Sequence, residues 1–268
     1  MLRRVFEKVT SKISFRRRLP ADFGGAEIYV SPSGGLRYLF HSMEKIDPGL
    51  CALAKEFVKR GDTVWDVGAN LGLFTFVASH FSGPSGRVFS FEPDVWLVQL
   101  LRRSSALQPT SSAPVQVVPV AIAESVDLRT FNIASRSRAA SFLSGYGTTQ
   151  TGGVSDQQTV LSVSLDWLAE RLPLPDVVKI DVEGAELEVL TGALRLLEKK
   201  RPLVLCEVSG ERSREVTALL KGRGYRIYDA EISHTQRSEV QLAPWSTIAI
   251  PAQQVFTEDA SAFRTPRC

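Results

Sequence analysis

A regular alternation of short apolar segments with amphipathic ones between residues 63 and 250 most limits how this chain can fold. Strands that are covered by helices on both faces read as short apolar runs, so the pattern predicts an α/β fold with a mostly parallel sheet. No clear helix joins the last two strands, and we therefore expect the final strand to be antiparallel. The expected strands are residues 63–67, 87–91, 115–122, 177–181, 203–208, 225–228 and 247–250, and the expected helices are 48–58, 71–81, 96–107, 185–200 and 213–223.

The chain has 268 residues, a length that fits one large α/β domain or two smaller ones. We expect one main domain over residues 61–252. A lead-in over residues 19–60, a basic segment over residues 1–18 and a tail over residues 253–268 lie outside it. The region 132–158 is rich in Ser, Gly, Thr and Gln and predicts a long irregular loop. Such loops are commonly lids or binding loops, although a surface excursion without a role is the alternative.

Charge and cysteine content exclude several classes of protein. The net charge is +3, but residues 1–18 hold seven Lys or Arg and one acidic residue, so the rest of the chain is mildly acidic. A basic nucleic-acid-binding body is therefore not expected. The three cysteines form no C-x-x-C pair, which favours a reducing compartment such as the cytoplasm. No apolar run reaches the roughly 18 residues of a membrane-spanning helix.

The basic segment 1–18 also has an apolar periodicity. Leu2, Val5, Phe6, Val9 and Ile13 recur at spacings of three and four, which would place them on one face of a helix. A helix with an apolar and a basic face can lie on an anionic membrane. The alternatives are a helix that packs on the main body and a frayed tail.

The segment Asp66-Val67-Gly68-Ala69-Asn70-Leu71-Gly72 joins the first predicted strand of the main domain to a helix. Glycines permit a sharp turn here, and open α/β sheets bind nucleotides at the carboxyl ends of such strands. The G-x-G-x-x-G pattern of dinucleotide sites is absent. An acid two residues before Gly68 suits a ligand with a cationic amino group, which favours S-adenosylmethionine over NAD.

Two further strand ends carry acids. Glu92 follows the second strand and lies 24 residues beyond Gly68, a separation typical of a carboxylate that binds ribose hydroxyls. Asp181, Glu183 and Glu186 lie within six residues at the end of the fourth strand. Like charges this close raise the pKa of at least one of them, which is common at functional sites.

The segments 66–75, 91–93 and 179–186, with 203–207, resemble the FkbM family of S-adenosylmethionine-dependent methyltransferases. The resemblance covers about residues 61–250. It implies a class I, Rossmann-like methyltransferase fold of seven strands with the last antiparallel. It also implies O-methylation of a hydroxyl group, plausibly on a sugar, a glycolipid or a secondary metabolite.

The resemblance also implies roles for individual residues. Glu92 would hold the ribose, and Ala121 would lie near the adenine. Asp181 and Glu183 would lie beside the transferred methyl group and the acceptor. The residues implied at the methionine end of the cofactor are Asp66, Gly68, Asn70, Gly72 and Thr75.

Methyl transfer from a sulfonium requires alignment of the acceptor oxygen and removal of its proton. We therefore expect Asp181 or Glu183 to be the general base and no metal to be required. A divalent cation bound by these carboxylates is the alternative. Weaker candidates for a site role are His234, Glu207, Arg136 and Arg138.

Two other functional classes remain open at this point. One is an NAD(P)-dependent oxidoreductase, and the other is a non-catalytic module that keeps a degenerate cofactor site for binding a partner. The sequence names neither the acceptor nor the oligomeric state.

Overall fold

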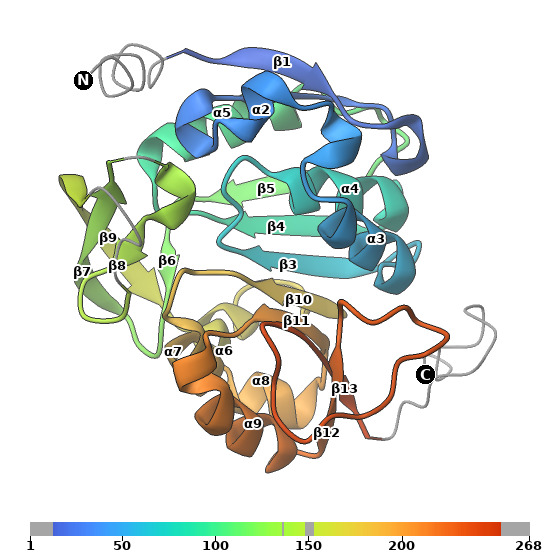
Figure 1. The fold of residues 1–268 in the computed structure, drawn as a ribbon, viewed down its shortest axis with the longest axis vertical. Coiled ribbons are helices and arrows are strands. Elements are labelled where there is room, and N and C mark those ends of the chain that lie inside the picture. The colour runs from blue at the N-terminus through green and yellow to red at the C-terminus, as the bar shows by residue number, and fades with distance from the viewer. Residues whose placement is uncertain (1–12, 136, 148–152, 253–268) are drawn as a thin grey trace.

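The computed structural model describes residues 13–135, 137–147 and 153–252, and its centre is the predicted mostly parallel sheet (Figure 1). The strand order is β12-β13-β11-β10-β3-β4-β5. Neighbours from β11 to β5 pair in parallel, and β13 is antiparallel to both of its neighbours. The strand bounds are β3 Thr63–Val67, β4 Arg87–Phe91, β5 Val115–Val118, β10 Val177–Ile180, β11 Leu203–Glu207, β12 Tyr225–Asp229 and β13 Ser246–Pro251.

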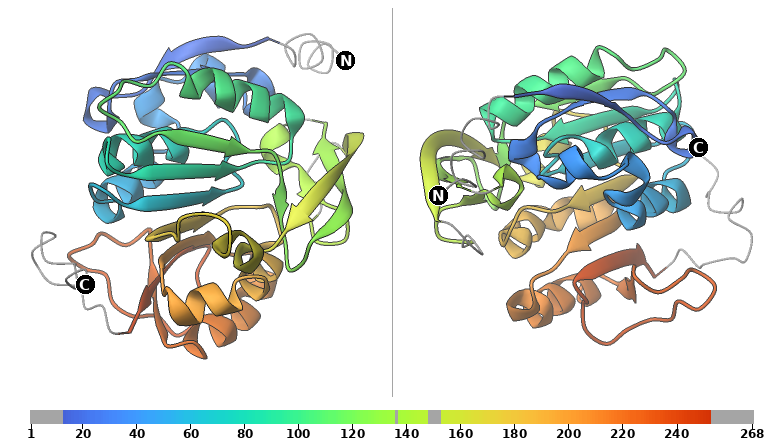
Figure 2. Two further views of the ribbon diagram at one scale, coloured as in Figure 1. Left: turned by 180° about the vertical axis from the view of Figure 1, so that it is seen from behind. Right: turned by 45° about the horizontal axis from the view of Figure 1, so that its top comes forward.

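Helices cover both faces of this sheet because successive side chains of each strand point to opposite faces. Val64 belongs to a hydrophobic cluster shared with α3, α4 and α5, whereas Trp65 and Val67 belong to a cluster shared with α6 to α9. Each cluster lies between the sheet and one layer of helices. Figure 2 shows these helices on either side of the sheet, from behind and with the top of the molecule tilted forward. The helix bounds are α2 Arg37–Phe40, α3 Pro48–Phe57, α4 Leu73–Ser82, α5 Val95–Ser105, α6 Leu165–Ala169, α7 Glu186–Thr191, α8 Leu194–Lys199 and α9 Ser213–Lys221.

Two predicted elements are divided in the structure. The expected strand 115–122 ends at Val118, and its last residues form β6 (Ala121–Ile122), which pairs in another sheet. Pro119 lies at the break and has no N–H to donate to a strand ladder. The expected helix 185–200 is divided into α7 and α8 at Gly192 and Ala193.

Strands form both ends of the region 132–158, so the prediction of one long irregular loop was wrong at those ends. β7 (Asp127–Ala134) and β9 (Val154–Val163) form a long antiparallel pair, and β6 and β8 (Phe142–Leu143) complete a four-stranded sheet. Between β7 and β8 lies the short helix η4 (Arg138–Ala140). We call residues 127–163 the insertion. In Figure 1 it lies beside the ends of β3, β4 and β5.

The N-terminal part of the described chain is also extended. Residues Phe15–Arg18 form strand β1, which pairs antiparallel with β2 (Glu27–Val30). The helix predicted for residues 1–18 is therefore wrong over 15–18, and residues 1–12 lie outside the described part. The 3-10 helix η2 (Pro32–Gly34) follows β2. Lead-in side chains such as Ile28 and Tyr38 are buried in the same cluster as α4.

Across the described residues, the helices are all too short or too polar to cross a bilayer.

Candidate active site

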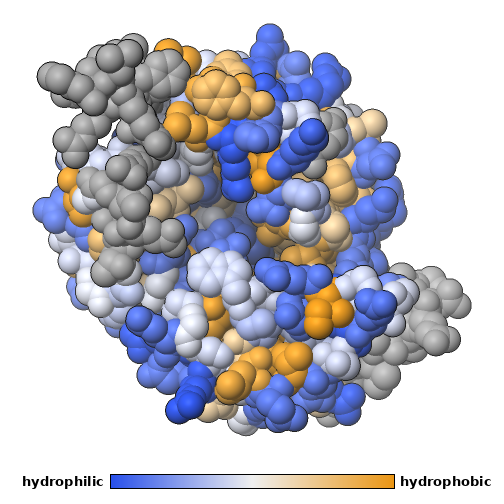
Figure 3. Space-filling model, in the orientation of Figure 1, coloured by the Kyte–Doolittle hydropathy of each residue, from blue (hydrophilic) through white to orange (hydrophobic). Residues whose placement is uncertain are grey.

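A pocket lies at the carboxyl ends of β3, β4 and β10, where parallel α/β sheets bind their ligands. It has an empty volume of about 550 Å³, including its open mouth. Figure 3 shows a hollow in this face of the molecule with a largely hydrophilic floor. The turns after the three strands supply most of its polar lining, and the insertion adds both apolar and polar residues such as Phe131, Leu143 and Arg138. The lining residues are Gly68, Asn70, Phe91, Glu92, Pro93, Leu97, Val120, Ala121, Ile122, Phe131, Arg138, Ala139, Ser141, Leu143, Asp181, Val182 and Glu183.

The turn after β3 is packed tightly against the turn after β10. Gly68 has a φ of +73°, and a Cβ at this position would lie 1.8 Å from the carbonyl oxygen of Asp181. Only glycine satisfies both the left-handed backbone and the close approach. Asn70 also has a positive φ, of +52°, and its buried Oδ1 has no hydrogen-bond partner. The turn thus contains a buried acceptor oxygen without a partner, on a residue that lines the pocket.

Glu92 is buried at the end of β4, where backbone groups fix its carboxylate. The N–H of Asn70 donates to Oε2 at 2.8 Å, and the N–H of Asp94 donates to Oε1 at 2.9 Å. Burial raises the pKa of Glu92 to about 8 because it disfavours the charged form, and the nearby Asp94 raises it further against these two hydrogen bonds. Each oxygen keeps acceptor capacity for a ligand hydroxyl.

Lys179 on β10 links the two turns. Its buried Nζ donates to the carbonyl oxygen of Gly68 at 2.9 Å and lies 3.2 Å from Asp66 Oδ1 and 3.5 Å from Asp181 Oδ2. Burial alone would lower the pKa of Lys179, but the two carboxylates outweigh it and hold the pKa above its usual value. The ammonium therefore stays charged and fixes the positions of both strand ends.

A cluster of acids in different environments lies in the turn after β10 and at the end of the neighbouring strand β11. Burial, and then repulsion from Asp181, raises the pKa of Glu183 to about 8 and that of Glu207 to about 7. Glu186 Oε1 accepts hydrogen bonds from the backbone N–H groups of Gly184 and Val182, at 2.9 and 3.4 Å, and so shapes the turn. Glu183 itself is held at a φ of +57°. This strained position puts a carboxyl group of raised pKa on the pocket wall.

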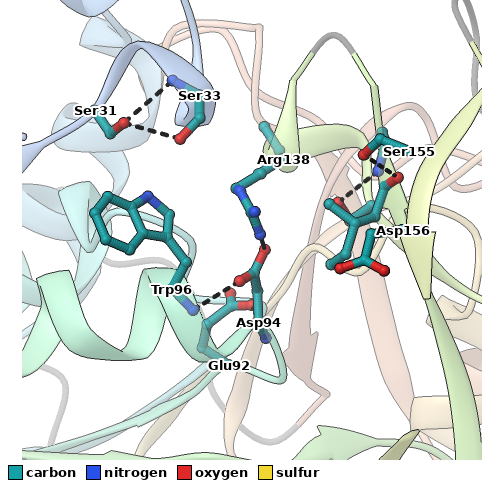
Figure 4. Close-up of polar contacts among 12 residues, drawn as sticks. Ser31, Ser33, Glu92, Asp94, Trp96, Arg138, Ser155 and Asp156 are labelled. Carbon is teal, nitrogen blue, oxygen red and sulfur yellow. Dashed lines mark hydrogen bonds and ion pairs between the residues drawn. The ribbon is translucent and has the colours of Figure 1, made fainter. Parts of the chain in front are cut away.

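The insertion reaches the pocket in two ways. From η4, Arg138 forms an ion pair with the fully buried Asp94 at 2.5 Å, and Figure 4 shows its guanidinium pointing towards Asp94 beside Glu92. After β8, a Cβ on Gly147 would lie 2.2 Å from the carbonyl oxygen of Glu183. Thus the insertion closes one side of the pocket and supports the turn that carries Glu183.

The structure brings most of the predicted site residues together. Gly68, Asn70, Glu92, Ala121, Asp181 and Glu183 all line the pocket. The other three do not. Asp66 is fully buried and paired with Lys179, Thr75 donates its hydroxyl hydrogen to Asp66 at 2.5 Å, and Gly72 packs against Phe76 and Leu101. The expectation that Asp66 meets a ligand ammonium directly does not fit this arrangement, because a lysine already occupies that position.

Several pocket residues escaped the sequence analysis. Phe131 and Leu143 belong to the insertion, whose strands were not predicted, and Leu97 was assigned only to a helix. The signal for β7 was weak, because apolar and polar residues alternate only in short runs within 127–134. The pairing of Lys179 with Asp66 had a weaker signal, since the two residues occupy corresponding positions on their strands.

Within the described ranges, no group of three or more His, Cys, Asp or Glu side chains is arranged to hold a metal ion. His234 lies in the exposed segment before β13, and Arg136 falls outside the described residues. Glu207 contributes to the electrostatics of the acidic cluster but is not among the pocket-lining residues.

Comparison with known proteins identifies the class. The model of the methyltransferase FkbM domain matches residues 66–227, more than half of the chain, and the chain therefore belongs to the FkbM methyltransferases. Its fold is the class I, Rossmann-like methyltransferase fold, with the sheet order and antiparallel β13 described above.

A curated relative is the hexuronic acid methyltransferase AglP of Haloferax volcanii, which is 29% identical over 198 residues, spanning 69% of this chain and 75% of the relative. A solved methyltransferase FkbM from Methylobacillus flagellatus KT is 19% identical with a TM-score of 0.43; the match covers 70% of this chain and 42% of that one. Fibrillarin from Aeropyrum pernix is 15% identical with a TM-score of 0.45, covering 90% and 83% of the two chains.

Proposed function

We propose that this methyltransferase transfers a methyl group from S-adenosylmethionine to a hydroxyl group of a sugar. The buried carboxylate of Glu92 carries the proposal. It lies on the pocket wall at the end of β4, held by two backbone N–H groups, and a carboxylate there suits the paired hydroxyls of a ribose.

The rest of the pocket fits the same cofactor. The unpartnered Oδ1 of Asn70 suits the ammonium of the methionine end, as does the negative charge of Asp181. Apolar side chains of Leu97, Ile122 and Phe131 suit the adenine. When bound, S-adenosylmethionine supplies an electrophilic methyl group on a positively charged sulfur.

We assign the general base to Glu183 and a positioning role to Asp181. A general base is most effective when its pKa lies near the working pH, and the pKa of Glu183 is about 8. Asp181 lies 3.5 Å from the ammonium of Lys179, an ion pair that holds its carboxylate in place on the pocket wall. Glu183 would accept the proton of the acceptor hydroxyl, while Lys179 and the Gly68 turn keep the two pocket walls in register.

A sugar acceptor is supported by the relative that methylates hexuronic acid. Labelled methyl donor incubated with the protein and panels of glycans, uronic acids and glycolipids tests the function. We expect a product that has gained one CH₂ unit and resists mild alkali, as an ether does. An alkali-labile product would identify a carboxylate as the acceptor, and transfer to nitrogen or carbon would contradict the proposal.

The same assay addresses a metal. We expect undiminished activity after chelation of divalent cations, because a carboxyl group of suitable pKa is already present to remove the proton. Loss of activity that is restored by added Mg²⁺ would assign this step to a metal instead.

A further inference from the structure

The helices and strands that Figure 1 draws above β5 are rich in arginine. The elements β1, β2, α2 and α5 contain six arginines and a single acidic residue, Glu27. The remainder of the chain is mildly acidic, so this charge is local. We call the group the arginine face; its members are Arg16, Arg17, Arg18, Arg37, Arg102 and Arg103.

Contacts of Arg103 and Arg17 join the four elements β1, β2, α2 and α5. Arg103 of α5 stacks over the ring of Tyr29 on β2, 3.7 Å from its centroid, and donates a hydrogen bond to Ser14 Oγ just before β1. Arg17 of β1 donates to the carbonyl oxygen of His41 at the end of α2. The side chains of Arg16 and Arg18 remain 55% and 71% exposed although both pair with Glu27.

Exposed apolar side chains lie next to these arginines. Phe40, the last residue of α2, is 71% exposed and precedes the residue that Arg17 contacts. Ile13 is 47% exposed and precedes Ser14, which Arg103 contacts. Figure 3 shows hydrophobic side chains gathered at the top of the molecule, over α2, bordered by strongly hydrophilic ones.

We propose that the arginine face, with Phe40 and Ile13, docks on the surface of an anionic lipid bilayer. Basic side chains beside exposed apolar ones match a surface of phosphates above hydrocarbon, and two modest contributions of this kind together give stable peripheral binding. A nucleic acid would use the arginines and could stack a base on Phe40, but it would leave the aliphatic Ile13 without a partner. The inference goes beyond methyl transfer and does not depend on it.

The arginine face is attached directly to the rim of the pocket. η2 follows β2 after one residue and packs against η4, which carries Arg138. α5 begins directly after Asp94, the partner of Arg138, and Arg103 lies about 12 Å further along the helix axis. Docking through this face would therefore hold the pocket close to the bilayer, within reach of sugars attached to lipids.

Flotation of the full-length chain with lipid vesicles tests the proposal. We expect binding to phosphatidylcholine vesicles that contain about 30 mol% phosphatidylglycerol, little binding to pure phosphatidylcholine, and release as salt screens the charges. The fourfold variant Arg16→Gln/Arg18→Gln/Arg102→Gln/Arg103→Gln should lower the partition coefficient at least about tenfold. Phe40→Ser should lower it less and mainly at high salt.

The matched control removes the same charge from the opposite half of the molecule. The variant Arg171→Gln/Arg195→Gln/Arg214→Gln/Arg226→Gln changes exposed arginines of α6, α8, α9 and β12 or the residues beside them, and it should bind like the wild type. Circular dichroism and melting confirm that each variant is folded. Absence of wild-type binding, equal binding by the fourfold variant, or binding to a single-stranded RNA oligonucleotide in place of vesicles would each overturn the proposal.

Discussion

Asp66 and Asp181 occupy similar places in the sequence pattern, each at the carboxyl end of a central strand, yet the structure puts them in different environments. Asp66 has no exposed surface and is held by Lys179 and Thr75. Asp181 has a 30% exposed side chain that lines the pocket and shares the same lysine. Lys179 thus contacts two strand-end acids, one buried in the scaffold and one on the pocket wall.

The difference teaches that a strand-end acid is not by itself a ligand contact. Its neighbours across the sheet decide its role. Lys179 pairs in register with Asp66, so its long side chain runs alongside that carboxylate before it reaches Asp181. The predictions below test this division, from the largest expected effect to the smallest.

Changing Gly68 to Ala should have the largest effect, because it separates the two turns. The new Cβ would lie 1.8 Å from the Asp181 carbonyl oxygen, at a φ of +73°. We expect a loss of about 5 kcal/mol or more in the free energy of unfolding, because the backbone clash adds to the strained φ. Denaturant melts measure it, with Gly210→Ala as the control, since that glycine has open space around it. Equal stability of the two variants would contradict the close packing of the turns.

Replacement of Lys179 by Met should leave Asp66 buried without its counter-charge and cost about 3–5 kcal/mol. Lys200→Met is the matched control, because the Lys200–Asp176 pair is about one-third exposed and should contribute at most about 1 kcal/mol. We expect the double variant Asp66→Asn/Lys179→Met to lose less free energy of unfolding than the two single variants lose together. Strict additivity would show that the two groups do not interact.

Removal of the proposed base should reduce turnover without weakening the binding of the cofactor. Glu183→Gln is expected to lower kcat by about 10²–10⁴-fold once an acceptor is known, whereas the affinity for S-adenosylhomocysteine stays near normal. In the wild type, kcat should rise with pH and level off above about 8, since the carboxylate form is the active one. The variant should lose this rise. Near-normal turnover by both Glu183→Gln and Asp181→Asn would end the general-base assignment.

The raised pKa of Glu183 also predicts a smaller effect, a pH-dependent change in the free energy of unfolding. Its pKa in the folded protein, about 8, lies above the ordinary value, so the stability it contributes is full at low pH and is lost as pH rises towards 8. Glu183→Gln should therefore melt like the wild type near pH 5 and be more stable above pH 8, by on the order of 1 kcal/mol. If the stability difference between the wild type and Glu183→Gln is the same at pH 5 and above pH 8, the carboxyl group does not have the raised pKa.

Much of the fold was predictable from the sequence because the buried strands are apolar runs separated by amphipathic helices. The order of elements and the antiparallel final strand follow from this pattern. The insertion was not predicted, since β9 (Val154–Val163) begins with polar, exposed residues and its Ser- and Gln-rich sequence is typical of a loop. Pairing with β7 overrides that local preference.

The candidate site was predictable to the level of strand ends. Glu92, Asp181 and Glu183 were found by their position after apolar runs, and the structure gathers them on one pocket. The burial of Asp66 and the ion pair of Arg138 with Asp94 depend on contacts between distant segments, which one sequence does not reveal.

Calorimetric titration of S-adenosylhomocysteine into the full-length protein tests the central claim most directly, because it needs no acceptor. Above pH 8, where Glu92 is ionised, we predict saturable binding at one site, weakened at least about tenfold by Glu92→Gln through loss of a charged acceptor for the ribose hydroxyls, and no heat from NAD⁺. Absence of heat with both S-adenosylmethionine and S-adenosylhomocysteine would contradict the assignment of this pocket as a cofactor site.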